Sequence, residues 1–169
     1  TMLAFLPVTV EGLALVSRSR TVKLKAEVLR LKAGPQDLLV EIRVPATPAG
    51  HHGAYGMLRD RNSIDFPLFG LAVRMDLAAN GSVSTIALVA VALQARPWRL
   101  RHVDALLGTQ PGTPEFDAAL EEVAVQAHKQ CIPLENVPGD AEYRRLMVPV
   151  VTRRTLRAAA DRSGPAHPV

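Results

Sequence analysis

Apolar and polar residues alternate with a period of two through the first part of the chain, the pattern of half-exposed strands. The segment Thr21-Val22-Lys23-Leu24-Lys25 shows it most clearly, inside a β-like region over residues 8–32. A turn over 33–37 separates this region from a further strand over 38–44, which ends at Pro45. The start of the chain is therefore predicted to consist of strands.

A hairpin is the clearest pattern in the middle of the chain. Apolar residues alternate over 71–77, and Asn80-Gly81 supplies the pair of positive φ angles that a type I′ turn requires. The return strand over 83–93 is apolar on both faces apart from Ser84 and Thr85. A strand of this kind is expected at the centre of a sheet, with both faces covered.

Helical patterns follow the hairpin. A short helix is predicted over 101–107, ending at Gly108. Thr113-Pro114-Glu115 then combines an N-cap, a proline at the first helical position and an acid in the first turn, which together mark a helix start. This helix should end near Cys131, with one buried stripe made of Phe116, Leu120, Val123 and Ala127.

The last helix is predicted to start at Asp140, whose carboxylate can cap the amide of Tyr143. Pro149 lies inside this helix and should kink it, because proline has no N–H to donate to the Arg145 carbonyl. The predicted buried stripe consists of Tyr143, Leu146, Met147, Val150 and Val151.

This order of strands, hairpin and helices predicts an α+β fold, an antiparallel sheet packed against helices as a sandwich. A βαβ nucleotide-binding fold would alternate strands with helices instead. The stretch PATPAGHHG, residues 45–53, is rich in Pro, Gly and Ala and is typical of a linker. We therefore expect one unit over 1–46, a second over 47–160 and a disordered tail over 161–169.

Composition narrows the class of protein. The chain has 169 residues, of which 48% are hydrophobic and 21% charged, as in an ordinary globular protein. The net charge is +4, yet the arginines are scattered and aromatic residues make up only 4%, which argues against a nucleic-acid partner. The apolar run over 2–10 is too short to span a membrane, so no membrane contact is expected and a cytoplasmic location is predicted.

No residue pattern marks a self-contained active site. His51 and His52 are adjacent and should point to opposite sides of an extended chain, so no metal site is expected there. Cys131, the only cysteine, is expected to be a buried structural thiol. Glu121 and Glu122 are neighbours on a helix and are expected to form a solvated face rather than an acid–base pair. No catalytic residue is therefore assigned.

Four blocks in register do resemble a known family. They are LLVEIRVP, AYGMLRDRNSIDFPLFG, QARPWRLRHVDALLG and IPLENVPGDAEYRRLMVPVVTRRTL. Together they resemble the FAD-binding medium subunit of molybdenum hydroxylases, the group of carbon monoxide dehydrogenase, xanthine dehydrogenase and 4-hydroxybenzoyl-CoA reductase. The likeness covers roughly residues 10–160. It implies the C-terminal α+β domain of that subunit, preceded by the tail of its FAD-binding domain.

The resemblance also implies cofactors and partners. Electrons would pass from a molybdenum cofactor in a large subunit, through 2Fe-2S clusters in a small subunit, to FAD and then to an acceptor, in a hetero-oligomer. Leu38 and Leu39 match an aliphatic pair that lies beside the flavin in this family, although a role in the strand core is an equal alternative. Met57 stands where the family usually has a lysine that reaches toward the flavin. The family's glycine-rich segments for the FAD pyrophosphate are not in this sequence, so the FAD site is expected to be incomplete.

Other family-like residues are expected to be structural. Asp65 should accept backbone N–H bonds or pair with Arg61, with contact to a ligand as the less favoured alternative. Tyr143 and Arg144 match the family pattern and should fasten the last helix to the sheet or to a partner subunit. Two hypotheses remain open: a subunit that takes part in electron transfer, and a docking domain that keeps the fold but has lost FAD binding.

Overall fold

The computed structural model describes the backbone of three N-terminal strands and, in full, residues 48–61, 65–135 and 140–161. The three strands form an antiparallel sheet in the order β2-β1-β3. Their bounds are β1 (Val10–Ser17), β2 (Arg20–Ala26) and β3 (Leu38–Ile42). The strands expected near the start of the chain are thus confirmed. The expected turn at 33–37 and the boundary at residue 46 lie outside the described residues.

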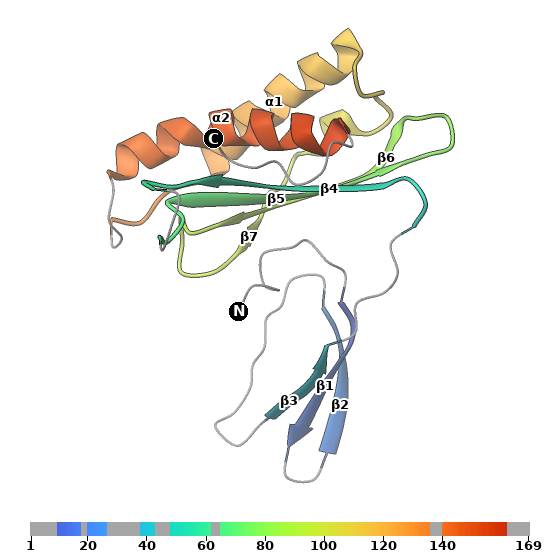
Figure 1. The fold of residues 1–169 in the computed structure, drawn as a ribbon, viewed down its shortest axis with the longest axis vertical. Helices are drawn as coiled ribbons and strands as arrows, with labels where there is room; N and C mark the ends of the chain where they lie inside the picture. The colour runs from blue at the N-terminus through green and yellow to red at the C-terminus, as the bar shows by residue number, and fades with distance from the viewer. Residues whose placement is uncertain are drawn as a thin grey trace.

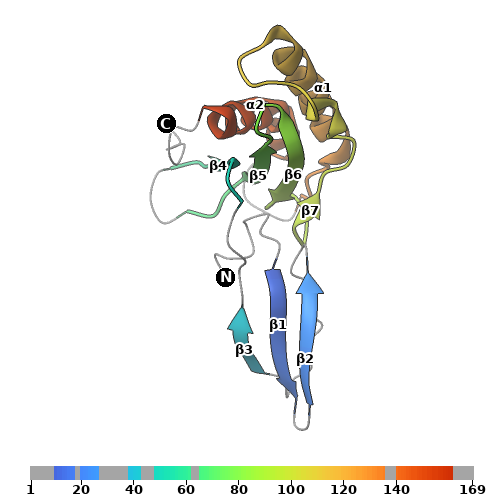
Figure 2. The ribbon, with the colours of Figure 1, turned by 90° about the vertical axis from the view of Figure 1, so that its right-hand side faces the viewer.

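The larger unit is a four-stranded antiparallel sheet with two helices on one face, which confirms the α+β prediction (Figure 1). The strand order is β4-β5-β6-β7, and Figure 2 shows this sheet and the three-stranded sheet as separate. The elements are β4 (His51–Leu58), β5 (Phe69–Leu77), β6 (Val83–Val91), β7 (Trp98–Arg99), the 3₁₀ turn η2 (Asp104–Leu106), α1 (Pro114–Gln130) and α2 (Ala141–Ala160).

The core lies between the sheet and the helices. Alternate residues of β5 and β6 point toward the helices, as the period of two requires. The other face of β6 is covered as well, since Val89 and Val91 are only 4% and 2% exposed, and this confirms the expected central strand. The main core residues are Phe69, Leu71, Val73, Met75, Ile86, Leu88, Ala90, Leu106, Phe116, Leu120, Val123, Ala127, Val148, Val151, Leu156 and Ala159.

The hairpin of β5 and β6 is confirmed, but its turn is not type I′. Gly81 has a φ of 81°, whereas Asn80 is absent from the residues with positive φ. Gly81 N donates to Ala78 O at 2.9 Å, and the ladder shifts register between Asp76 and Leu77. The turn is therefore type I followed by a glycine in the left-handed conformation, which forms a bulge and needs only one positive φ.

The start of β4 differs from prediction. His51 to Gly53 belong to this strand rather than to the linker, because they pair with Asp76, Met75 and Arg74 of β5 in that order. Tertiary pairing here overrides a composition typical of loops.

The helix expected over 101–107 is reduced to the single 3₁₀ turn η2. The Gln130 side chain binds the backbone N–H and C=O of Arg101, and His102 has a φ of 56°. Neither residue can therefore enter a helix, although Gly108 ends the turn as expected with a φ of 80°.

Helix α1 agrees with its sequence pattern. Thr113 is the N-cap and its hydroxyl accepts a bond from Phe116 N at 3.2 Å, while Pro114 is the first helical residue. The predicted stripe is buried throughout. Cys131 follows the last helical residue and is 2% exposed, and burial raises the pKa of its thiol to about 12. The buried structural thiol is thus confirmed.

Helix α2 begins as predicted at Asp140, whose carboxylate accepts from Glu142 N at 2.8 Å rather than from Tyr143 N. Its predicted buried stripe is confirmed at Val151, which is 5% exposed, but is wrong at Tyr143 and Leu146, which are 47% and 59% exposed. The helix is rotated so that Arg144 and two threonines face the core. Its buried residues are Arg144, Val148, Val151, Thr152, Thr155, Leu156 and Ala159.

The polar side chains on this buried face each donate to a backbone carbonyl, although Arg144 Nε and Nη1 are buried without a hydrogen-bond partner among the described residues. Thr152 and Thr155 donate to the carbonyls of Val148 and Val151, at 2.8 and 2.7 Å. Arg144 Nη2 donates to the Leu134 carbonyl and so fastens the segment after α1. Arg144 thus fastens α2 to the segment after α1. Tyr143 is 47% exposed, and its role in fastening the helix to the sheet or to a partner subunit stays a prediction.

Pro149 does not interrupt α2, which is continuous over 141–160. It does free the Arg145 carbonyl, as expected, and His128 Nδ1 of α1 lies 3.1 Å from that oxygen. The neighbouring helix thus supplies the donor that the proline lacks. Two ion pairs also join the helices, Arg153 to Glu121 at 2.8 Å and Arg157 to Asp117 at 3.7 Å.

Within the described residues, no helix is long and apolar enough to cross a membrane. The expected tail beyond Asp161 lies outside those residues.

Candidate functional site

The position expected to face a flavin lies near the end of β4. His52 and Gly56 of β4 lie on the side of the strand that faces α2. Because side chains alternate along a strand, Tyr55 and Met57 point to the opposite face of the sheet. Arg59 lies two residues further on, and its Nε donates to Met57 Sδ at 3.0 Å. A thioether is a weak acceptor and carries no charge, but this contact places a guanidinium beside it.

Tyr55 covers the neighbouring strand. A Cβ on Gly70 of β5 would overlap the Tyr55 hydroxyl and lie 2.7 Å from Val91 Cγ2, so the ring can lie there only because position 70 is glycine. Burial raises the pKa of the Tyr55 hydroxyl, and the positive charge of Arg59 acts in the opposite direction. Tyr55 and Met57 therefore form a half-buried edge that an adjoining surface could contact.

Asp65 binds the backbone that directly follows β4. Its Oδ2 accepts from Asp60 N at 3.0 Å and from Arg61 N at 3.2 Å. The predicted backbone-binding role of Asp65 is confirmed, and the charged turn after β4 is held by one carboxylate.

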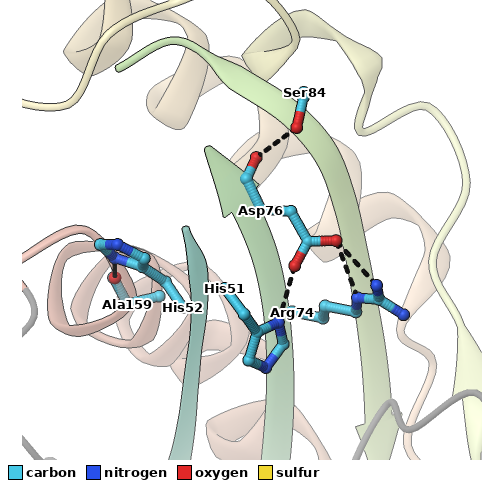
Figure 3. Close-up of polar contacts among 6 residues, drawn as sticks. All are labelled: His51, His52, Arg74, Asp76, Ser84 and Ala159. Carbon is cyan, nitrogen blue, oxygen red and sulfur yellow. Dashed lines mark hydrogen bonds and ion pairs between the residues drawn. The ribbon is translucent and has the colours of Figure 1, made fainter. Parts of the chain in front are cut away.

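A polar cluster that sequence reasoning missed lies at the other end of β4. Asp76 is 6% exposed, and its Oδ1 is 2.6 Å from His51 Nδ1 (Figure 3). Its Oδ2 accepts from Arg74 Nε and Nη2 at 3.1 and 2.7 Å. The strand register pairs His51 with Asp76, and Arg74 lies two residues away on the same face. Only that register, which no local pattern reveals, brings the three together.

The cluster determines the ionisation of Asp76. Burial alone would raise the pKa of this carboxyl, but hydrogen bonds from Arg74 and His51 and their positive charge outweigh burial and lower it. A folded-state pKa below the unfolded value contributes stability above about pH 4, and this contribution is lost as the pH falls through the folded pKa.

We expect Asp76→Asn to lower the free energy of unfolding by about 2 kcal/mol at pH 7, because the amide cannot replace the charged acceptor. The same variant should lose less stability than the wild type between about pH 5 and pH 2, since the titrating group is gone. Urea unfolding across this range measures both effects. Glu122→Gln, an exposed acid on α1, is the control, and parallel curves for the wild type and both variants would contradict the prediction.

His51 and His52 lie on opposite sides of the strand, as predicted (Figure 3). His52 is 6% exposed, and its Nδ1 is 2.9 Å from the Ala159 carbonyl of α2. Among the residues that the structure describes, no three His, Cys, Asp or Glu side chains are grouped to hold a metal ion.

The other two predicted flavin-facing residues lie on a strand of the three-stranded sheet. Leu38 and Leu39 belong to β3, where they pair with Val16 and Leu15 of β1, and their side chains lie outside the described part. Met57 belongs to the other sheet. Their assignment to a flavin site stays a prediction.

The described residues do not by themselves fit FAD. A pyrophosphate needs several converging backbone N–H donors, usually in a glycine-rich loop at a helix N-terminus. In residues 48–61, 65–135 and 140–161, the glycines with positive φ are separated along the chain, at Gly50, Gly81, Gly108 and Gly112. No step of a reaction can be assigned to a flavin on these residues alone.

Known proteins resemble this chain in sequence. The carbon monoxide dehydrogenase medium chain of Afipia carboxidovorans is 32% identical over 130 residues, which cover 76% of this chain and 43% of that protein. The corresponding chain of Hydrogenophaga pseudoflava is 34% identical over 127 residues, covering 73% and 41%. The chain therefore spans less than half the length of these relatives.

Solved structures also resemble this chain. Carbon monoxide dehydrogenase from Hydrogenophaga pseudoflava, lacking the Mo-pyranopterin moiety of its cofactor, matches 93% of this chain and 54% of its own, with a TM-score of 0.74 and 30% identity. Quinoline 2-oxidoreductase from Pseudomonas putida 86 shares the fold at a TM-score of 0.74 and 17% identity, over 95% of this chain and 54% of its own. The family model described as the CO dehydrogenase flavoprotein C-terminal domain matches residues 54–159, and the chain belongs to this family.

Proposed function

We propose that this chain is the C-terminal portion of the FAD-binding medium subunit of a molybdenum-containing hydroxylase or dehydrogenase. The observation that carries the proposal is the family match over residues 54–159, on a sheet and helix pair of the same fold. In the proposed cytoplasmic complex, electrons pass from 2Fe-2S clusters of a small subunit through FAD to an acceptor. A large subunit holds the molybdenum cofactor.

The contribution of this chain is proposed to be a surface beside the flavin together with contacts that support assembly. Tyr55 and Met57 occupy the sheet face opposite the helices, and Arg59 brings a positive charge to the same end of β4. Leu38 and Leu39 are proposed to adjoin the flavin from the other sheet. Relatives named as a medium chain and as a dehydrogenase complex subunit support a hetero-oligomer.

Co-purification with large molybdenum and small iron–sulfur subunits, together with flavin absorbance, tests the proposal. The Met57→Lys variant should raise the flavin-to-protein ratio, because an ammonium can donate charged hydrogen bonds where a thioether cannot. A gain of about tenfold in affinity is the scale of one such bond. Met147→Lys makes the same substitution on α2 and should leave the ratio unchanged. A purified complex without flavin absorbance would rule out the electron-transfer role.

A docking domain without FAD is the second candidate. It is favoured by Met57 in the lysine position and by the absence of a phosphate-binding loop among the described residues. In that case the complex forms, flavin is absent and Met57→Lys changes nothing. The flavin content of one purified complex therefore distinguishes the two functions.

A further inference from the structure

A cleft opens along β6, on the side where the chain after β7 returns to that strand. Leu100 N donates to Leu88 O and Gly108 N donates to Val83 O, at 2.9 and 2.8 Å. The returning segment is longer than the part of β6 that it spans, so it must bulge away between these bonds. The resulting cleft has a volume of about 530 Å³ and is lined on the β6 side by Ile86. Small-molecule sites have volumes of about 300–1,000 Å³.

One wall of this cleft is held rigidly. The Gln130 side chain accepts from Arg101 N at 2.8 Å and donates to Arg101 O at 2.6 Å, so the last residue of α1 fixes the backbone of the wall. The next residue, His102, has a φ of 56°, which costs a residue other than glycine about 1–2 kcal/mol. Backbone strain that the surroundings hold in place is concentrated at functional sites.

The charge in the cleft is predominantly positive. Two arginines, Arg99 and Arg101, line it together with one carboxylate, Asp104, and with His102. Arg101 is exposed, so its guanidinium is accessible to a ligand. A planar guanidinium forms paired hydrogen bonds with the oxygens of a phosphate or a carboxylate, which makes an anion the expected ligand.

The cleft is also apolar on the side of β7. Pro97, Trp98 and Leu100 belong to its lining. The indole Nε1 of Trp98 is buried and has no acceptor among the described residues, although a buried indole N–H usually has one. A ligand for this wall needs a flat apolar part.

We propose that this cleft binds a small organic anion in which a planar ring carries a phosphate, the chemistry of a nucleoside monophosphate. The ring packs against Trp98 and Pro97, and the phosphate accepts bonds from Arg101. Inorganic phosphate has no ring to pack against Trp98 and Pro97, and a neutral nucleoside has no phosphate to accept bonds from Arg101. The proposal requires no flavin and no partner subunit, so it is independent of the function proposed above.

Trp98 makes the test direct, because it is the only tryptophan in the sequence. Its fluorescence in the full chain is followed during titration with AMP, adenosine or inorganic phosphate. AMP should give a saturable change with a dissociation constant at least about tenfold lower than that of either other probe. Arg101→Ala should raise the AMP constant about tenfold, the scale of one charged hydrogen bond.

Two control variants show whether AMP binds in this cleft or elsewhere on the chain. Arg154→Ala removes an exposed arginine of α2 outside the cleft and should leave the AMP constant unchanged. Met57→Lys should also leave it unchanged, which separates the cleft from any flavin-facing surface. The proposal is overturned by no response to millimolar AMP, by equal responses to AMP and phosphate, or by equal effects of the two arginine variants.

Discussion

Replacing Gly56 by alanine should push helix α2 away from strand β4 and lower the free energy of unfolding by about 3 kcal/mol. A Cβ at this position would overlap the Thr155 hydroxyl and lie 3.2 Å from Thr155 Cβ and 3.3 Å from Val151 Cγ1. Thr155 cannot turn aside easily, because it is 1% exposed and its hydroxyl donates to the Val151 carbonyl at 2.7 Å. Urea unfolding measures the loss.

Gly53→Ala is the matched control on the same strand. Its Cβ would meet nothing nearer than 3.6 Å, which is an ordinary contact distance. This variant should change stability by less than about 0.5 kcal/mol, or raise it slightly by restricting the unfolded chain. Equal losses for the two glycines would show that α2 does not pack closely on β4 at Gly56.

Leu156→Ala should cost about 3 kcal/mol, whereas Leu146→Ala on the same helix should cost no more than about 0.5 kcal/mol. Leu156 is 0% exposed and its truncation leaves a cavity in the core, while Leu146 is 59% exposed. Chemical denaturation of both variants compares the same substitution on the two sides of α2. A larger loss at position 146 would restore the helix orientation that the apolar pattern predicts.

The orientation of α2 shows where sequence reasoning fails. The apolar residues 143, 146, 147, 150 and 151 form a regular stripe, and periodicity alone places that stripe in the core. The structure buries Val151 but turns Tyr143 and Leu146 to the surface. It buries Arg144, Thr152 and Thr155, each of which donates a hydrogen bond to a backbone carbonyl. Polar side chains that donate to backbone carbonyls can occupy a core face, and no count of apolar residues reveals this.

Local sequence signals, by contrast, are sufficient to predict several elements of the fold. The start of α1 follows from Thr113 and Pro114, whose capping and fixed φ act within one turn. The β5–β6 hairpin follows from Asn80-Gly81, although its bulge does not. The cluster around Asp76 could not be found in this way, since His51 is 25 residues away and reaches it only through strand register.

The contact between His128 and the Arg145 carbonyl has a consequence for how relatives can vary. Proline at position 149 leaves that carbonyl without its usual donor, and a side chain from another helix supplies one at 3.1 Å. A relative with any other residue at 149 regains its own helical N–H and has no need of a donor at 128. These two positions should therefore change together during evolution, although they belong to different helices.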